Sequence, residues 1–356
     1  MPHAELDPKS DRYTPMENLL YRRSPFGFWG TTIAIFVISF GSFLLICHIT
    51  QRPPIYEVAA DGSISFPSVV WIGFVLSMIL TSALSLSENG VRLWRAVEED
   101  LVRALKPSGE NAARAFAAGV PVSWRGRYLG FFAAGALAGL GFNAFMIVVN
   151  AGTLERYLSS IGLWFLVFAP FLYGLGVRAG VDVARESSEL KTLVRDHLQV
   201  DLYHLDRLHV LGRIGLRAAL SWLLMAAVLL LFVAAPSQMT VGLISIGISI
   251  AGGMWVFWSA VKPAHEQIRE AKSAELERIH ERMALLRDAA LAGDVEAASA
   301  LAGLTDYEQW IEQRPEWPLS PSVTQRFALY ILIPVLPIIA SYLFEKVADL
   351  VLGATS

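Results

Sequence analysis

Two histidines and an aspartate are spaced so that a single helix could present them to a metal ion. His197, Asp201 and His204 stand at positions i, i+4 and i+7, and this spacing places them on one face of an α-helix. Two imidazoles and a carboxylate form a ligand set that suits zinc or another transition metal. The alternative, which we favour, is a charged helix face that is solvated or packed in a bundle and binds no metal.

Small and hydroxyl-bearing residues recur every four positions in an otherwise apolar segment. Gly73, Ser77, Thr81 and Ser85 would form a stripe along one face of a helix. Such a stripe can hydrogen-bond to a neighbouring helix, or it can line a path for an ion or a small substrate. Packing is the favoured interpretation, and a channel or passive transporter is the alternative.

Charged residues gather where several apolar segments end. Glu88, Arg178, Asp182 and His265 could converge into a ring that binds an ion or a lipid head group. More often such residues lie separately at the membrane surface and fix the orientation of the chain. The sequence has no glycine-rich phosphate loop and no nucleophile elbow. It therefore gives no positive evidence for an enzyme, and no cofactor is expected.

The composition indicates what kind of element must position these residues. Hydrophobic residues make up 54% of the 356 residues and charged residues 17%, whereas about a quarter of a soluble domain is charged. A membrane protein fits this balance. The net charge of −3 does not favour a nucleic-acid partner. The single cysteine, Cys47, excludes an intramolecular disulfide and a zinc site built from cysteines.

Apolar runs predict membrane-spanning helices, which need about 20 apolar residues each. Six runs come close to that length almost free of charge, and they comprise residues 28–49, 69–86, 129–149, 161–177, 218–235 and 239–261. A seventh run, 327–344, is shorter and contains Pro334 and Pro337, which membrane helices tolerate. We predict an all-α, polytopic membrane bundle of seven spans with a kinked last span. A re-entrant or interfacial hairpin is the alternative for the seventh run.

The placement of lysine and arginine predicts the orientation. All but three of the 29 basic residues lie on one side of the predicted spans, and the exceptions are Arg52, Arg156 and Lys346. The basic side is therefore expected to be the cytoplasmic face of a bacterial inner membrane, with the N-terminus inside. The C-terminus lies outside if the seventh run spans the membrane.

The basic side also carries most of the polar sequence. The predicted units are a cytoplasmic N-terminal segment (1–27), three membrane hairpins (28–86, 128–180 and 218–261), three cytoplasmic helical segments (87–127, 181–217 and 262–326) and a kinked last span (327–352). Apolar residues at helical spacing predict cytoplasmic helices over 89–105, 186–211, 265–291 and 294–313. Each must bury its apolar face, which predicts a helical bundle within one chain or between copies.

The C-terminal quarter resembles a group of uncharacterised prokaryotic multi-spanning membrane proteins. The resemblance lies in Pro263 to Lys272 after a span, in the turn Arg314-Pro315-Glu316-Trp317-Pro318-Leu319, and in Arg326 to Tyr330 opening a proline-bearing span. These proteins share the amphipathic helix, the Trp-Pro turn and the final kinked helix. The resemblance implies architecture and no activity.

These observations predict a non-enzymatic membrane protein whose cytoplasmic helical bundle serves assembly or signalling. The alternatives are a channel lined by the hydroxyl stripe and a metal-responsive membrane sensor that uses the histidine cluster. Membrane lipid, further copies of this chain and a cytoplasmic protein are the expected partners.

Overall fold

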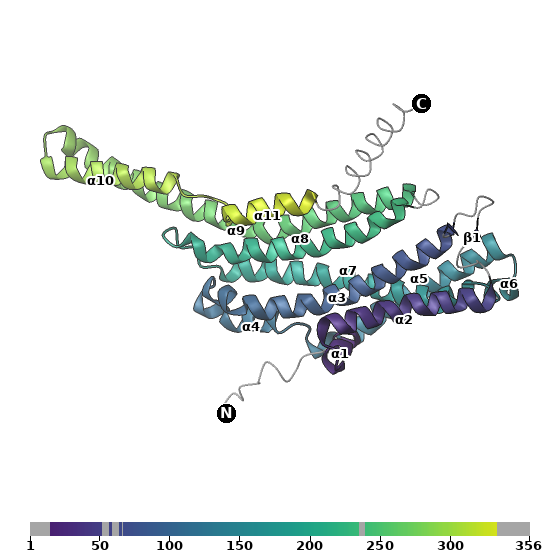
Figure 1. Cartoon of the computed structure of the whole chain (residues 1–356). Helices are drawn as coiled ribbons and strands as arrows, with labels where there is room; N and C mark the ends of the chain where they lie inside the picture. Colours follow the sequence, from purple (N-terminus) through teal and green to yellow (C-terminus); the bar gives the residue numbers. More distant parts are fainter. Residues whose placement is uncertain (1–14, 52–56, 59–63, 66, 235–238, 333–356) are drawn as a thin grey trace, which may run out of the picture.

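The computed structural model describes residues 15–51, 57–58, 64–65, 67–234 and 239–332. These residues are almost entirely helical, and the long helices lie side by side along one axis (Figure 1). The long helices are α2 (Gly27–Thr50), α3 (Ser68–Arg103), α5 (Arg125–Met146), α7 (Gly162–His197), α8 (His209–Leu230) and α9 (Met239–Leu291). The all-α class is therefore confirmed.

Shorter elements connect the long helices. The α-helices among them are α1 (Met16–Arg23), α4 (Glu110–Ala117), α6 (Leu154–Leu158), α10 (Val295–Glu312) and α11 (Pro321–Leu332). Single turns of 3-10 helix form η1 (Pro107–Gly109), η2 (Val122–Trp124), η4 (Leu205–Leu208) and η5 (Leu231–Ala234), and η3 (Ile147–Ala151) is a π-helix. A minimal antiparallel ladder joins β1 (Glu57–Val58) to β2 (Ile64–Ser65).

Five helical stretches of the described residues are long and apolar enough to cross a membrane. They are Gly27–Thr50, Ser68–Arg103, Val122–Ala151, Gly162–His197 and Leu205–Leu230. The sixth predicted run, 239–261, is the first part of α9 and is helical throughout, but it is not among these five. The seventh run begins in α11, and its remainder with Pro334 and Pro337 lies outside the described residues.

Glycines bring two of these helices into backbone contact. A Cβ added to Gly139 of α5 would lie 2.5 Å from the Cα of Pro170 in α7, and one added to Gly135 would meet the carbonyl oxygen of Tyr173. Close approach through small residues stabilises helix pairs in lipid, where the hydrophobic effect is absent. Side chains on the outer faces, such as Val37 of α2 and Val148 of η3, remain exposed, as lipid-facing residues would be.

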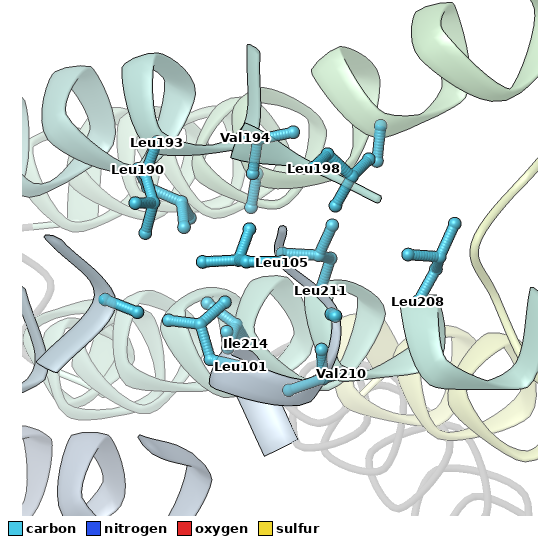
Figure 2. Close-up of a cluster of buried hydrophobic side chains, with 14 of the residues drawn as sticks. Leu101, Leu105, Leu190, Leu193, Val194, Leu198, Leu208, Val210, Leu211 and Ile214 are labelled. Carbon is cyan, nitrogen blue, oxygen red and sulfur yellow. The ribbon is translucent and has the colours of Figure 1, made fainter. Parts of the chain in front are cut away.

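The helices continue past their apolar parts at one end of the molecule, which we call the charged end. It comprises residues 87–103 of α3, 178–197 of α7 and 262–291 of α9, together with α4 and the start of α8. Their apolar side chains form one buried cluster (Figure 2), whose central members include Leu101, Leu105, Val194, Leu198, Leu208, Leu211 and Ile268. These helical segments therefore pack against one another within one chain.

One predicted helix of the charged end is wrong. The pattern predicts a continuous helix over 186–211, but α7 ends at His197 and the chain is irregular until η4. The backbone N–H of Lys106 bonds the carbonyl oxygen of His197 at 2.8 Å, and the N–H of Gln199 bonds the carbonyl oxygen of Ala104 at 3.1 Å. These hydrogen bonds, which form a short bridge to the end of α3, use backbone groups of residues 197 and 199 that would otherwise continue α7. The helix therefore ends there, and Leu198 is buried.

Helix α10 corresponds closely to the helix predicted over 294–313. Asp294 caps α10 by accepting hydrogen bonds from the N–H groups of Glu296 at 2.9 Å and Ala297 at 3.2 Å. The helix predicted over 265–291 is continuous with the sixth apolar run, because α9 runs through Pro263 without interruption. Val261 and Ala264 on either side of it are fully buried, so packing holds the helix together there.

Candidate functional site

The predicted metal cluster does not form on one helix face. His197 is the last residue of α7, and its Nδ1 lies 3.5 Å from Ser108 Oγ. Asp201 and His204 belong to the irregular connection, where their side chains lie 2.8 Å apart. The spacing argument for a metal site is therefore wrong, because it required an unbroken helix. Within the described part of the chain, no group of three His, Cys, Asp or Glu residues could hold a metal ion.

Asp201 instead organises the connection between α7 and η4. Its carboxylate accepts the backbone N–H of Tyr203 at 2.9 Å in addition to its contact with His204. The pKa of the Asp201 carboxyl lies below its usual value. The main cause is the hydrogen bond from His204, and the second is the hydrogen bond from the Tyr203 N–H. The turn presents the Tyr203 ring to α10, where its centroid lies 4.7 Å from that of Trp310.

The hydroxyl stripe of α3 packs against α1 and α2. The Ser39 hydroxyl of α2 donates to Ser77 Oγ at 3.1 Å, and Ser85 Oγ lies 2.9 Å from the Tyr21 hydroxyl of α1. Thr81 and Ser85 also donate to the carbonyl oxygens of the residues four positions earlier in α3. A Cβ on Gly73 would lie 2.6 Å from the Phe43 ring. Neighbouring side chains of the same chain therefore occupy this face.

The residues of the predicted charge ring make their contacts in separate places. Glu88 is buried in α3 and pairs with Arg92 at 2.9 Å. Asp182 pairs with Arg185 at 3.0 Å, and His265 lies against the Trp317 ring. Among the described residues, no hydrogen bond or ion pair joins Glu88, Asp182 and His265 to one another. Arg178 lies one helical turn before Asp182 on α7.

A buried charge network locks α5 to α7 at the charged end. The Arg185 side chain is 5% exposed and bonds Glu189 at 2.8 Å and Asp182 at 3.0 Å. Its Nε also donates to the Tyr128 hydroxyl of α5 at 3.2 Å, while that hydroxyl donates to Asp182. The i, i+3 and i, i+4 charges on α7 are visible in the sequence, but the tyrosine contact is not. The sequence analysis missed this network.

The predicted Trp-Pro turn is held on α9 by two side chains of that helix, His265 and Lys272. The His265 ring stacks on Trp317, and its Nδ1 lies 3.0 Å from the carbonyl oxygen of Glu316. Lys272 donates to the carbonyl oxygens of Glu312 at 2.8 Å and Arg314 at 3.3 Å. The end of α10, the turn and the start of α11 are thereby held on one helix.

Beyond this turn, α9 and α10 form a projecting hairpin that we call the arm, defined as residues 272–291 of α9 with α10 (Figure 1). Ile279 and Ile311 are buried between its two helices. His280 Nε2 lies 2.5 Å from the Glu308 carboxylate across them. The arm is therefore an ordered helical hairpin with a small buried core between its two helices.

Comparison with known proteins found no matching family model, no matching curated protein and no matching solved structure.

The tip of the arm differs from the charged end because its apolar side chains are exposed. Leu285, Leu291 and Val295 are 82%, 81% and 82% exposed. Single exposed apolar residues are common on protein surfaces, but these three flank one turn of one hairpin. The arm tip is therefore an exposed apolar surface.

Proposed function

We propose that this chain is a non-enzymatic protein of a bacterial inner membrane whose arm joins copies of the chain on the cytoplasmic side. The observation that carries the proposal is the exposed apolar tip of the arm. Removing such side chains from water on association contributes about 25 cal/mol for each Å² of apolar surface buried.

The position of the tip supports protein contact over lipid contact. Leu291 lies 30 residues beyond Val261, the last residue of the sixth apolar run, and a helix of that length measures about 45 Å. The tip therefore stands well away from the apolar parts of the helices. An apolar surface at that distance is better suited to another protein than to the membrane.

The tip also has the charge pattern of a self-complementary surface. Glu281 and Arg282 alternate in sign on the last turns of α9, and Arg287 and Asp288 do so again. Two hairpins that pair through their tips would form a four-helix arrangement, which is a common solution for amphipathic helices. An interface between identical patches needs groups of both signs, and the tip supplies them.

The fixed base of the arm favours binding. Association costs free energy when it immobilises flexible groups, so a pre-ordered surface binds more tightly than a mobile one. Lys272, His265 and Trp317 hold the base of the arm. The stacking of Tyr203 on Trp310 adds a contact between α10 and the connection after α7.

The same structural features bear on the membrane orientation of the chain and on the channel and metal-sensor alternatives. The basic residues gathered at the charged end support a cytoplasmic location for it. The channel alternative requires the Gly73–Ser85 stripe to line an open path, but side chains of α1 and α2 lie against this stripe. The metal-sensor alternative loses the one-helix geometry on which it depended.

Site-specific photo-crosslinking in intact cells tests the proposal. Leu285, Leu291 or Val295 is replaced by p-benzoylphenylalanine in the full-length chain. We expect a crosslinked species of twice the chain mass at each of the three positions. The control position is Glu99 of α3, whose side chain is also highly exposed at the charged end.

The other possible outcomes of the crosslinking experiment distinguish self-assembly from its alternatives. A crosslink from the tip to a different protein would replace self-assembly by docking of that protein. Equal crosslinking from the tip and from Glu99 would show random collision and would overturn the proposal, as would no crosslinking from the tip. The substitution Leu291→Arg should abolish a genuine tip crosslink from position 285.

A further inference from the structure

A cavity of about 300 Å³ lies between α3, α8 and α11 at the charged end, and three arginines line it. Its polar lining includes Arg213, Arg217, Arg326, Ser221, Ser320 and Ser322. Leucines from α3 and α8, together with Asn89, Val323 and Tyr330, form the rest of its wall. We call it the arginine cavity. It is separate from the arm and from the Arg185 network.

The arginine cavity carries an excess of positive charge. No carboxylate is among its lining residues, and of the three arginines only Arg213 has an ion-pair partner within the described residues, Asp100 at 2.6 Å. The Nη1 atom of Arg217 is buried without a hydrogen-bond partner among the described residues. An unsatisfied buried donor on a charged group costs free energy, so an anion with several acceptor oxygens would stabilise this arrangement.

The arginine cavity also lies where three helices change from polar to apolar sequence. On α8 the change falls between Arg217 and Leu220, and on α11 it follows Arg326. On α3 the apolar run ends at Leu86, and Leu86 and Asn89 both line the cavity. Three independent segments thus place the cavity at the level of a membrane surface, which is where lipid phosphates lie.

Packing around the cavity fixes the start of α11. A Cβ on Gly212 of α8 would lie 2.8 Å from the carbonyl oxygen of Pro318, so glycine allows the turn before α11 to approach α8 closely. The turn is also held by the stacking of Trp317 on His265. Ser320, Ser322 and Arg326 are thereby brought to the arginines of α8, although more than a hundred residues separate them in the chain.

We infer that the arginine cavity binds a phosphate group, with Arg217 and Arg326 as its principal donors and the serine hydroxyls as further donors. Arginine suits this role because its planar fork donates two parallel hydrogen bonds to phosphate oxygens. The volume is at the lower end of the range for ligand pockets, which fits a single phosphate group with part of its glycerol. The leucine-lined wall fits the first part of an acyl chain. The group comes either from an anionic membrane lipid or from free phosphate.

Native mass spectrometry of the purified full-length protein in detergent tests the inference. The probes are phosphatidylglycerol, phosphatidylcholine and inorganic phosphate, each added to delipidated protein. We expect phosphatidylglycerol to bind about tenfold or more tightly than phosphatidylcholine, because phosphatidylcholine carries the same phosphodiester but its choline cation would be repelled by the three arginines. The variant Arg217→Gln/Arg326→Gln should lose this preference. The control is Arg195→Gln, which removes an exposed arginine outside the cavity at the same end.

The outcomes separate the two sources of phosphate. Preferential binding of phosphatidylglycerol that inorganic phosphate does not displace supports a lipid phosphate. Binding of inorganic phosphate alone, lost in the double variant, supports free phosphate as the ligand. Equal binding of every probe to the wild type and the double variant would overturn the inference.

Two milder variants keep the test decisive if the double variant fails to fold. Arg326 is exposed, so Arg326→Gln should fold and bind phosphatidylglycerol more weakly than the wild type. Arg217→Lys keeps the charge but loses the planar fork, and we expect an intermediate affinity. Wild-type affinity in both variants would also overturn the inference.

Discussion

The imidazole ring of His265 lies flat on the indole ring of Trp317, with the ring centroids 3.9 Å apart and the planes 2° from parallel. His265 stands in α9 directly beyond the sixth apolar run, and Trp317 lies in the turn between α10 and α11. This one contact therefore connects the base of the arm with the start of α11, which contributes to the arginine cavity.

Replacing Trp317 by alanine should loosen both features. The half-buried indole stacks on His265 and packs near Trp258, and we expect a loss of roughly 2 kcal/mol of stability. Thermal unfolding in detergent measures the loss, and limited proteolysis should show faster cleavage between residues 312 and 320. Trp29→Ala, which removes an exposed indole from α2, is the control. Unchanged proteolysis in Trp317→Ala would contradict the assigned role of the contact.

Two glycines of α3 offer a matched test of the packing along the hydroxyl stripe. In Gly73→Ala the new methyl group would lie 2.6 Å from the buried ring of Phe43, and overpacking of this kind costs about 1–3 kcal/mol. In Gly90→Ala the methyl group meets nothing within 4 Å, so helix propensity should stabilise the protein by up to about 1 kcal/mol. Thermal unfolding of the two variants should move in opposite directions. A stable Gly73→Ala protein would show that α2 does not pack on this face.

Removing Arg185 should weaken the contact between α5 and α7 at the charged end. Arg185→Ala leaves Asp182 and Glu189 near each other without their shared cation, and breaking such a buried pair costs about 3 kcal/mol. Partial exposure of both carboxylates reduces this value. Arg103→Ala removes an exposed arginine of α3 and should change stability by less than about 1 kcal/mol. Equal thermal stability of the two variants would argue against the network.

The turn at Asp201 should depend on pH. The folded state lowers the pKa of this carboxyl, so its ionised form favours folding above the usual aspartate pKa of about 3.9. That contribution is lost as the pH falls through the lower folded value. The stability difference between the wild type and Asp201→Asn should be present near neutral pH and vanish in acid. Glu99→Gln serves as an exposed control, and a difference independent of pH would contradict the role of the carboxylate.

Local signals predicted much of the helical architecture. The apolar runs predict the long helices, and the helix predicted over 294–313 matches α10, which Asp294 caps. The continuation of α3 beyond the second apolar run also followed from apolar spacing. These features depend on contacts within one helix or on burial of one face, and the sequence displays both directly.

Features that depend on contacts between distant segments were missed. The end of α7 at His197 depends on hydrogen bonds to residues 104–106, and no residue near position 197 indicates that these bonds form. The passage of α9 through Pro263 depends on burial of its neighbours. Arg217 and Arg326 belong to different predicted units, so their common cavity appears only when the chain is folded.

The unbroken course of α9 has a mechanical consequence. Its 53 residues form a rod about 80 Å long, with its first part in the apolar sequence and its last turn at the arm tip. A tilt of about 5° at Val261 would displace Leu291 by roughly 4 Å, because the intervening helix measures about 45 Å. Because α9 is unbroken, a tilt of its apolar part would be transmitted to the arm tip and enlarged in proportion to the length of the helix between them.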